Sequence, residues 1–89
     1  MNISRGEQRV LHVLAQGGYI RHTRADGRRI TSIECMTRDG NLLSDCSLGV
    51  FFRLKRRGLI ESRNGSPYRI SRFGRVAVRS QSDNRETRA

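Results

Sequence analysis

Arginine is the residue type with the most evident chemistry in this chain, because its planar guanidinium grips phosphate or carboxylate through two parallel hydrogen bonds. The 89 residues include 18 Lys or Arg and 8 Asp or Glu, which gives a net charge of +10. Residues 53–79 hold nine of the basic residues and one acidic residue, Glu61, so this segment carries +8. The segment is predicted to bind a polyanion or an acidic protein surface.

Eight arginines of this basic segment are the candidate partner- or nucleic-acid-binding residues. They fall on one face of a predicted helix, in the hairpin that follows it, and along the last predicted helix. They are Arg53, Arg56, Arg57, Arg63, Arg69, Arg72, Arg75 and Arg79. A solvated basic face that only keeps the protein soluble is the competing interpretation. The clustering favours binding, since residues 1–52 carry only +2 and residues 80–89 carry no net charge.

Catalytic and metal-binding patterns have little support in the residue spacing. The two histidines and two cysteines follow no zinc-ligand spacing, and neither C-x-x-C nor H-E-x-x-H occurs. Cys46 lies near a predicted helix start, where a helix N-terminus favours a thiolate, but no base is placed beside it. We therefore expect a protein that is not an enzyme and that binds no metal and no cofactor.

Length and composition limit the architecture. A chain of 89 residues allows one domain with a modest core and no deep substrate cavity. No apolar run approaches the ~20 residues that span a bilayer, and the first residues, MNISRGEQR, lack an apolar signal region. Two cysteines are too few for a disulfide scaffold, so both are expected to be thiols. A soluble, cytoplasmic protein without membrane contact is expected.

The first half is predicted to form a helix and a three-stranded meander. Ser4 and Glu7 form a capping box, and an apolar face follows as far as about Gln16. Two Asp-Gly turns then separate stretches of β character. The expected strands are residues 19–23, residues 30–37, with Cys35 buried, and residues 42–43.

The second half is predicted to form a basic helix, a wing hairpin and a last helix. The basic helix should be capped by Ser44 or Asp45 and end at Gly58. The hairpin should pair residues 59–63 with residues 68–71. The last helix should begin at Ser71 and pack Phe73, Val76 and Ala77 on one face. The fold class is therefore α+β, with residues 1–80 as a single winged-helix-like domain and residues 81–89 as a polar, flexible tail.

Several separate segments, spread from Met1 to about Arg85, resemble the bacterial YjhX family. In chain order they are Asn2-x-Ser4-Arg5, Glu7-Gln8-Arg9-x-Leu11-His12-Val13-Leu14-Ala15-x-Gly17-Gly18, Glu34-Cys35, Asp45-Cys46, Asn64-Gly65-x-Pro67-Tyr68-Arg69-Ile70 and Asp83-Asn84-Arg85. That family is described as the toxin half of a toxin–antitoxin pair that inhibits DNA topoisomerase I. The resemblance thus implies DNA topoisomerase I and a cognate antitoxin as partners, and it carries no catalytic residues.

Two hypotheses remain open from the sequence. The first is a stoichiometric inhibitor whose basic face docks on topoisomerase I or on its bound DNA. The second is a winged-helix-like transcriptional regulator, in which the basic helix enters the major groove of duplex DNA and the wing contacts the backbone. An exposed edge of the meander could also pair with a second copy to give a homodimer.

Overall fold

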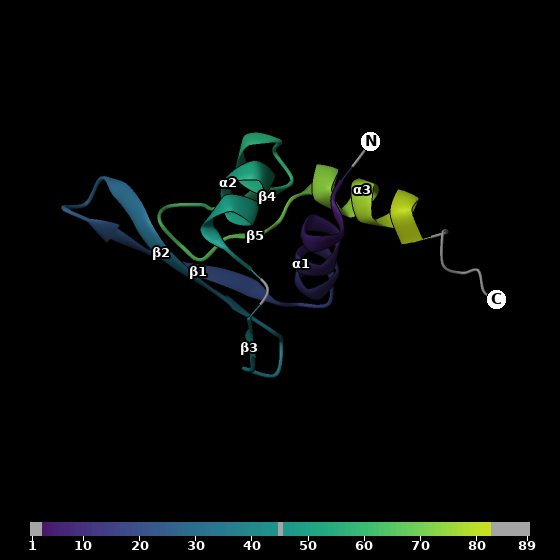
Figure 1. Cartoon of the computed structure of the whole chain (residues 1–89), viewed down its shortest axis with the longest axis horizontal. Coiled ribbons are helices and arrows are strands. Elements are labelled where there is room, and N and C mark those ends of the chain that lie inside the picture. Colours follow the sequence, from purple (N-terminus) through teal and green to yellow (C-terminus); the bar gives the residue numbers. More distant parts are fainter. Residues whose placement is uncertain (1–2, 45, 83–89) are drawn as a thin grey trace.

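The computed structural model describes residues 3–44 and 46–82, and it places three helices and five strands in that part of the chain (Figure 1). In chain order the elements are α1 (Arg5–Ala15), β1 (Tyr19–Ala25), β2 (Arg29–Met36), β3 (Leu42–Leu43), α2 (Leu48–Arg56), β4 (Ile60–Glu61), β5 (Arg69–Ile70) and α3 (Arg72–Ser82). One antiparallel sheet has the order β1-β2-β3, and β4 pairs with β5. The predicted α+β class is confirmed.

Helix α1 begins at the predicted capping box. Ser4 Oγ accepts a hydrogen bond from the N–H of Glu7 at 3.1 Å, and Glu7 Oε1 accepts one from the N–H of Ser4 at 2.7 Å. The apolar residues that this helix buries are Val10, Leu11 and Leu14. The capping box therefore fixes the start of a helix whose apolar face lies against the core.

Strands β1 and β2 form a long hairpin around the first Asp-Gly turn. Asp26 and Gly27 have φ angles of +55° and +72°, the left-handed conformation that a tight hairpin turn requires. Cys35 of β2 lies opposite Ile20 of β1 and Leu43 of β3, and it is 1% exposed. The predicted meander and the buried thiol are confirmed, with strand ends that differ by one or two residues.

Helix α2 begins later than predicted. Its N-cap is Ser47, whose Oγ accepts from the N–H of Val50 at 3.2 Å, so the predicted cap at Ser44 is wrong; the alternative cap, Asp45, lies outside the described residues. The chain is still engaged with the sheet through Leu43, and Cys46 packs against the core before the helix starts. The helix ends as predicted, just before a glycine with positive φ at position 58.

The β4–β5 hairpin is shorter than predicted and is tied to the first sheet. Only two residues of each strand pair, because Tyr68 turns away to bond with Ile20 of β1. The N–H of Tyr68 donates to the carbonyl of Ile20 at 2.8 Å, and the reverse bond measures 2.9 Å. The hairpin thus connects β1 with α3 rather than standing alone.

Helix α3 turns a different face to the core from the one predicted. Its first turn is capped by Ser71, as predicted, with Oγ accepting from the N–H of Gly74 at 3.0 Å. Ala77 is buried, but Phe73 and Val76 are 48% and 51% exposed, so placing them in the core was wrong. A Cβ at Gly74 would lie 2.2 Å from the carbonyl oxygen of Leu59. This close approach turns the Gly74–Ala77 side inward and the two larger side chains outward.

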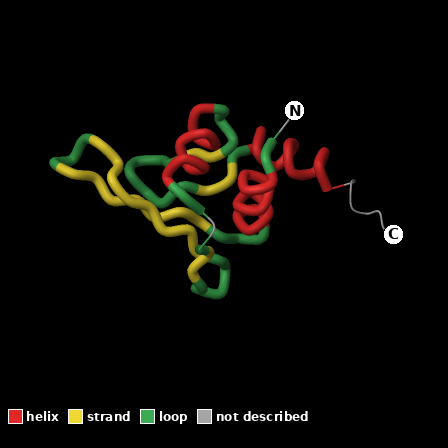
Figure 2. The backbone as a smooth tube through the Cα atoms, viewed as in Figure 1, coloured by secondary structure: helices red, strands yellow, loops and turns green. Residues whose placement is uncertain are grey.

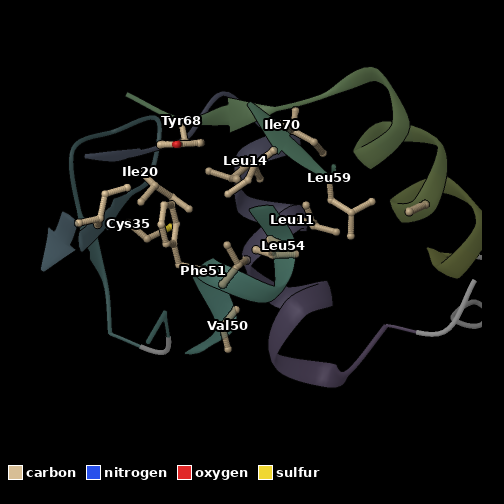
Figure 3. Packing of buried hydrophobic residues seen from close by; sticks show 14 residues of the cluster. Leu11, Leu14, Ile20, Cys35, Val50, Phe51, Leu54, Leu59, Tyr68 and Ile70 are labelled. Carbon is tan, nitrogen blue, oxygen red and sulfur yellow. The ribbon is translucent and has the colours of Figure 1, made fainter. Parts of the chain in front are cut away.

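The core lies where α1, α2, β1 and the β4–β5 hairpin converge (Figure 3). Phe51 of α2 is fully buried and meets Tyr68 edge-on, with ring centroids 5.0 Å apart. Around it pack Leu11 and Leu14 of α1 and Leu54 of α2. One apolar cluster therefore fixes the hairpin and both helices relative to one another.

The β1–β2 hairpin projects from this body as an arm (Figures 1 and 2). It occupies the place in the chain where a helix-turn-helix has its supporting helix, so the winged-helix-like description stays a prediction. The division near residue 80 also stays a prediction. Helix α3 extends to Ser82, and residues 83–89 of the expected tail lie outside the described residues.

Candidate partner-binding surface

Three of the eight candidate arginines meet at one shallow hollow between the β4–β5 hairpin and α3. They are Arg63 in the loop after β4, Arg69 on β5 and Arg75 on α3. The hollow measures about 300 Å³ and is completed by Glu61, Ser66, Pro67 and Ile70. We call this region the wing hollow. It brings arginine residues from three parts of the chain to one surface, and arginine side chains can bind an anion.

The arginines of the wing hollow are held only weakly by the protein. Arg63 Nη2 lies 3.8 Å from Glu61 Oε2, and their side chains are 85% and 51% exposed. Such an exposed pair is screened by solvent and contributes about 0–1 kcal/mol. The guanidinium of Arg69 lies 5.3 Å from the centre of the Tyr19 ring, a stacking contact that orients it without neutralising its charge. A partner can therefore engage these side chains at low cost.

Two candidate arginines, Arg53 of α2 and Arg57 directly after it, are instead engaged by a buried carboxylate of α1. Arg57 Nη1 and Arg53 Nε lie 3.5 and 3.7 Å from the same oxygen, Oε2 of Glu7. The Glu7 side chain is only 4% exposed, and its other oxygen accepts the N–H of Ser4. The arginines of the predicted basic helix face therefore differ in their contacts, because Arg53 and Arg57 connect α2 to α1 through Glu7.

The ionisation of Glu7 reflects this arrangement. Burial alone would raise its pKa, but the hydrogen bonds from Ser4 and the attraction of Arg57 and Arg53 outweigh burial and lower the pKa below its ordinary value. Glu7 is therefore ionised at neutral pH and neutralises part of the charge of α2. The capping box identified this residue in the sequence, but its link to α2 depends on a contact 50 residues away.

The remaining candidates are exposed but do not line the wing hollow. Arg56 lies at the end of α2. Arg72 is the first residue of α3, and Arg79 is the last residue of α3 whose side chain is described. Of the eight, the structure brings together three, ties two to α1 and spreads three over the surface. Whether each binds a partner stays a prediction.

Sequence reasoning missed a second group of basic residues, at the end of the β1–β2 hairpin. Arg24, Arg28 and Arg29 are all exposed there. In the sequence, their charge was summed with that of all five acidic residues of residues 1–52, four of which lie outside this hairpin end. The close spacing of the three arginines around the Asp-Gly turn was the signal that could have revealed them.

The cysteines are free thiols, as predicted, and they contact each other. The hydrogen bond with Cys46, together with burial, raises the pKa of Cys35, whereas that same hydrogen bond lowers the pKa of Cys46. Cys46 is thus the thiol that ionises first. Within residues 3–44 and 46–82 no group of three His, Cys, Asp or Glu side chains is arranged to hold a metal ion.

One buried polar atom is left without a partner in the described residues. His22 Nδ1 is buried and makes no hydrogen bond, and its ring meets Tyr68 edge-on at 5.2 Å. Burial lowers the pKa of His22, and the nearby charges of Arg24 and Lys55 lower it further. This histidine is therefore neutral at pH 7 and packs as an aromatic ring.

None of the helices in the described part of the chain is long and apolar enough to cross a membrane.

Comparison with known proteins identifies the family. A family model described as "Putative toxin of bacterial toxin-antitoxin pair" matches residues 1–85. A UPF0386 protein of Brucella anthropi is 69% identical over 85 residues, covering 96% of this chain and 100% of the relative. A UPF0386 protein of Beijerinckia indica is 66% identical with the same coverage. A third, of Rhodospirillum rubrum, is 66% identical over 94% of this chain and 93% of its own.

No solved structure matches the chain. The family match extends over nearly the whole sequence, and these relatives align with it almost end to end. The chain therefore belongs to the YjhX family of toxins from bacterial toxin–antitoxin pairs, as its sequence motifs indicated.

Proposed function

We propose that this protein is a stoichiometric inhibitor of bacterial DNA topoisomerase I, and that it binds the enzyme or its DNA complex through the wing hollow. Membership of a toxin family supports an inhibitory role. The resemblance of the sequence motifs to that family implies topoisomerase I as the target. The observation that carries the proposal is the meeting of Arg63, Arg69 and Arg75 around one hollow. Acidic enzyme surface and DNA phosphate both offer the oxygens that such guanidinium groups bind.

The side chains of the wing hollow suit binding better than proton transfer. Arginine remains protonated in proteins, so it cannot act as a general base. The single carboxylate that lines the hollow, Glu61, already lies beside Arg63. We therefore propose that inhibition involves no chemical reaction catalysed by this chain.

Relaxation of supercoiled plasmid tests this proposal. Purified topoisomerase I is mixed with increasing amounts of the protein, and the extent of relaxation is read from an agarose gel. We expect relaxation to fall as the inhibitor approaches equimolar amounts. Undiminished relaxation at a several-fold excess would rule the proposal out.

A second, unrelated topoisomerase separates enzyme binding from coating of the DNA. A protein that binds topoisomerase I should leave the second enzyme active at the same concentration. A protein that only covers DNA should inhibit both enzymes equally, with inhibition that disappears as salt rises.

A DNA-binding transcriptional regulator is the second candidate function. The observation that favours it is the order of α2 and the β4–β5 hairpin, with the hairpin bonded back to β1 through Tyr68. Against it, Arg53 and Arg57 of α2 are engaged by Glu7 of α1, so two guanidinium groups of the expected reading helix already have a partner. A gel-shift titration with promoter and random duplexes tests it, and no sequence preference at any salt concentration would eliminate it.

The family implies a cognate antitoxin as a further partner. A cytoplasmic location and a homodimer remain predictions of the sequence. Size-exclusion chromatography with light scattering would decide between monomer and dimer.

A further inference from the structure

The end of the β1–β2 hairpin is a second basic surface, at the far end of the arm (Figure 1), and none of its residues lines the wing hollow. We call residues 23–29 the arm tip. Every residue from 23 to 29 is exposed, whereas Ile30, directly after them, is only 5% exposed and belongs to the core. The arm tip therefore contributes little to the packing of the protein and presents its side chains to solvent.

Three positive charges and one negative charge occupy the arm tip. Arg24, Arg28 and Arg29 face only Asp26 there, and within residues 3–44 and 46–82 none of these three arginines forms an ion pair. Arg24 Nη1 donates to the backbone carbonyl of Arg28 at 2.7 Å, which orients the guanidinium but leaves its charge. The arm tip thus carries a net charge of +2 that the fold does not neutralise.

Two other acidic residues that balance the charge of the first half of the sequence, Glu7 and Glu34, lie away from the arm tip. Glu7 is buried on α1 beside the arginines of α2. Glu34 is near the base of the hairpin, where its Oε1 lies 2.6 Å from Arg21 Nη2. Neither carboxylate is placed at the arm tip, so the near-neutral total of residues 1–52 conceals a local basic surface.

The donor chemistry of the arm tip matches phosphate. Its arginines are flanked by the exposed residue Thr23, and arginine and threonine are among the residue types that bond the phosphate oxygens of DNA. The arm tip offers no exposed large apolar or aromatic side chain, the anchor on which most protein interfaces depend. Asp26 is the one acidic residue of the arm tip, and its charge does not favour phosphate. Its φ angle of +55° explains its presence, because Asp, Asn and Gly are the residues that favour this backbone conformation in a hairpin turn.

We propose that the arm tip binds the phosphate backbone of duplex DNA. A two-stranded ribbon fits the major groove, which is about 12 Å wide. The loop at its end has only three residues, 26–28, and the N–H of Arg28 donates to the carbonyl of Ala25 at 3.0 Å, which keeps the end of this ribbon narrow. The proposal goes beyond inhibition of topoisomerase I, since it concerns direct contact with DNA and does not need the enzyme.

Fluorescence anisotropy with a labelled 20-base-pair duplex tests the proposal over a series of salt concentrations. The test variant is Arg28→Ser with Arg29→Ser. The matched control is Arg5→Ser with Arg38→Ser, which removes the same charge from exposed positions outside the arm tip. Thermal unfolding of each variant checks that the fold is kept.

Loss of two phosphate contacts should weaken binding about tenfold or more at low salt and reduce the slope of log K against log salt by about 2. The control should keep most of the affinity and slope of the wild type. Equal losses in both variants would contradict the proposal, because total charge would then account for binding. Absence of any binding by the wild type at low salt would also contradict it.

A gain-of-affinity variant protects the test from misfolding. Asp26→Asn removes the one negative charge of the arm tip and keeps a residue that tolerates positive φ. We expect this variant to bind the duplex several-fold more tightly, and a damaged fold would not produce that result. Unchanged affinity of Asp26→Asn for the duplex would overturn the proposal. Arm-tip variants that change binding to topoisomerase I but not binding to the duplex would overturn it too. The duplex titration contains no topoisomerase I, so its result does not depend on whether the protein inhibits plasmid relaxation.

Discussion

The arginines of α2 and those of the wing hollow belong to one basic segment but lie in different surroundings. Arg53 and Arg57 share one oxygen of a carboxylate that is almost fully buried. Arg63, by contrast, has an exposed carboxylate beside it, and Arg69 lies over an aromatic ring. The first pair stabilises the contact between two helices, whereas the second pair remains available to a partner.

This difference shows that charge density alone does not assign a role to an arginine. The position of one acidic residue, Glu7, decides it, because a buried carboxylate needs nearby cations and takes them from α2. The wing hollow lacks a buried acid of this kind among the residues that line it. Matched variants of the two groups of arginines can separate a role in stability from a role in binding.

Removing Glu7 should produce the largest loss of stability. Glu7→Ala deletes half of the capping box and leaves the arginines of α2 without their carboxylate. We expect the free energy of unfolding to fall by about 2 kcal/mol, measured by urea denaturation. Glu7→Gln is the matched control, since Gln can still accept the N–H of Ser4. A loss below about 0.5 kcal/mol in Glu7→Ala would contradict the bracing role.

Neutralising the braced pair should cost less. Arg53→Gln with Arg57→Gln is expected to lower the free energy of unfolding by about 1 kcal/mol, because both side chains are partly exposed at 49% and 38%. The same change at Arg69 and Arg75 should alter stability by less than about 0.5 kcal/mol. Thermal unfolding of the two double variants measures this contrast, and a reversed order of stability would show that the two regions are assigned wrongly.

Acid should weaken the braced region specifically. The folded protein lowers the pKa of Glu7, so its contribution to stability is complete well above pH 4.5 and is lost as pH falls through the lower folded value. Denaturation between pH 3 and pH 7 should therefore show a smaller acid-induced loss in Glu7→Gln than in the wild type. Parallel curves for the two proteins would mean that Glu7 is not the group that titrates.

The smallest effect is expected on the outer face of α3. Phe73 and Val76 are 48% and 51% exposed, so Phe73→Ser and Val76→Ser should each change the free energy of unfolding by less than about 0.5 kcal/mol. Gly74→Ala on the opposite face is the contrasting variant, because its Cβ would meet the carbonyl of Leu59. A large loss in Phe73→Ser would show that this face is packed rather than open.

Local signals in the sequence predicted much of the fold. The capping box at Ser4 and Glu7 and the turn at Asp26 and Gly27 each depend on residues within a few positions of one another. The start of α2 was predicted wrongly because pairing of Leu43 with β2 is a tertiary contact. The inward face of α3 was wrong for the same reason, since the approach of Gly74 to Leu59 is not a local pattern.

The sequence predicted which segment holds the candidate arginines, but not which of them pair with Glu7 and which line the wing hollow. The count of charges identified the basic segment, which contains the three arginines that line the wing hollow. It could not show that Glu7 reaches Arg53 and Arg57 across the chain, because that contact depends on how α1 packs against α2. The net charge of residues 1–52 also concealed the arm tip, because Arg24, Arg28 and Arg29 are close together whereas most of the acidic residues of that half lie outside the arm tip.

The most direct test of the central claim is plasmid relaxation by topoisomerase I with the two matched double variants as inhibitors. Arg69→Gln with Arg75→Gln should raise the concentration needed for half inhibition by about tenfold or more. Arg53→Gln with Arg57→Gln should inhibit like the wild type at a temperature where it remains folded. Equal inhibition by both variants, or a loss confined to the Arg53 and Arg57 variant, would contradict the assignment of binding to the wing hollow.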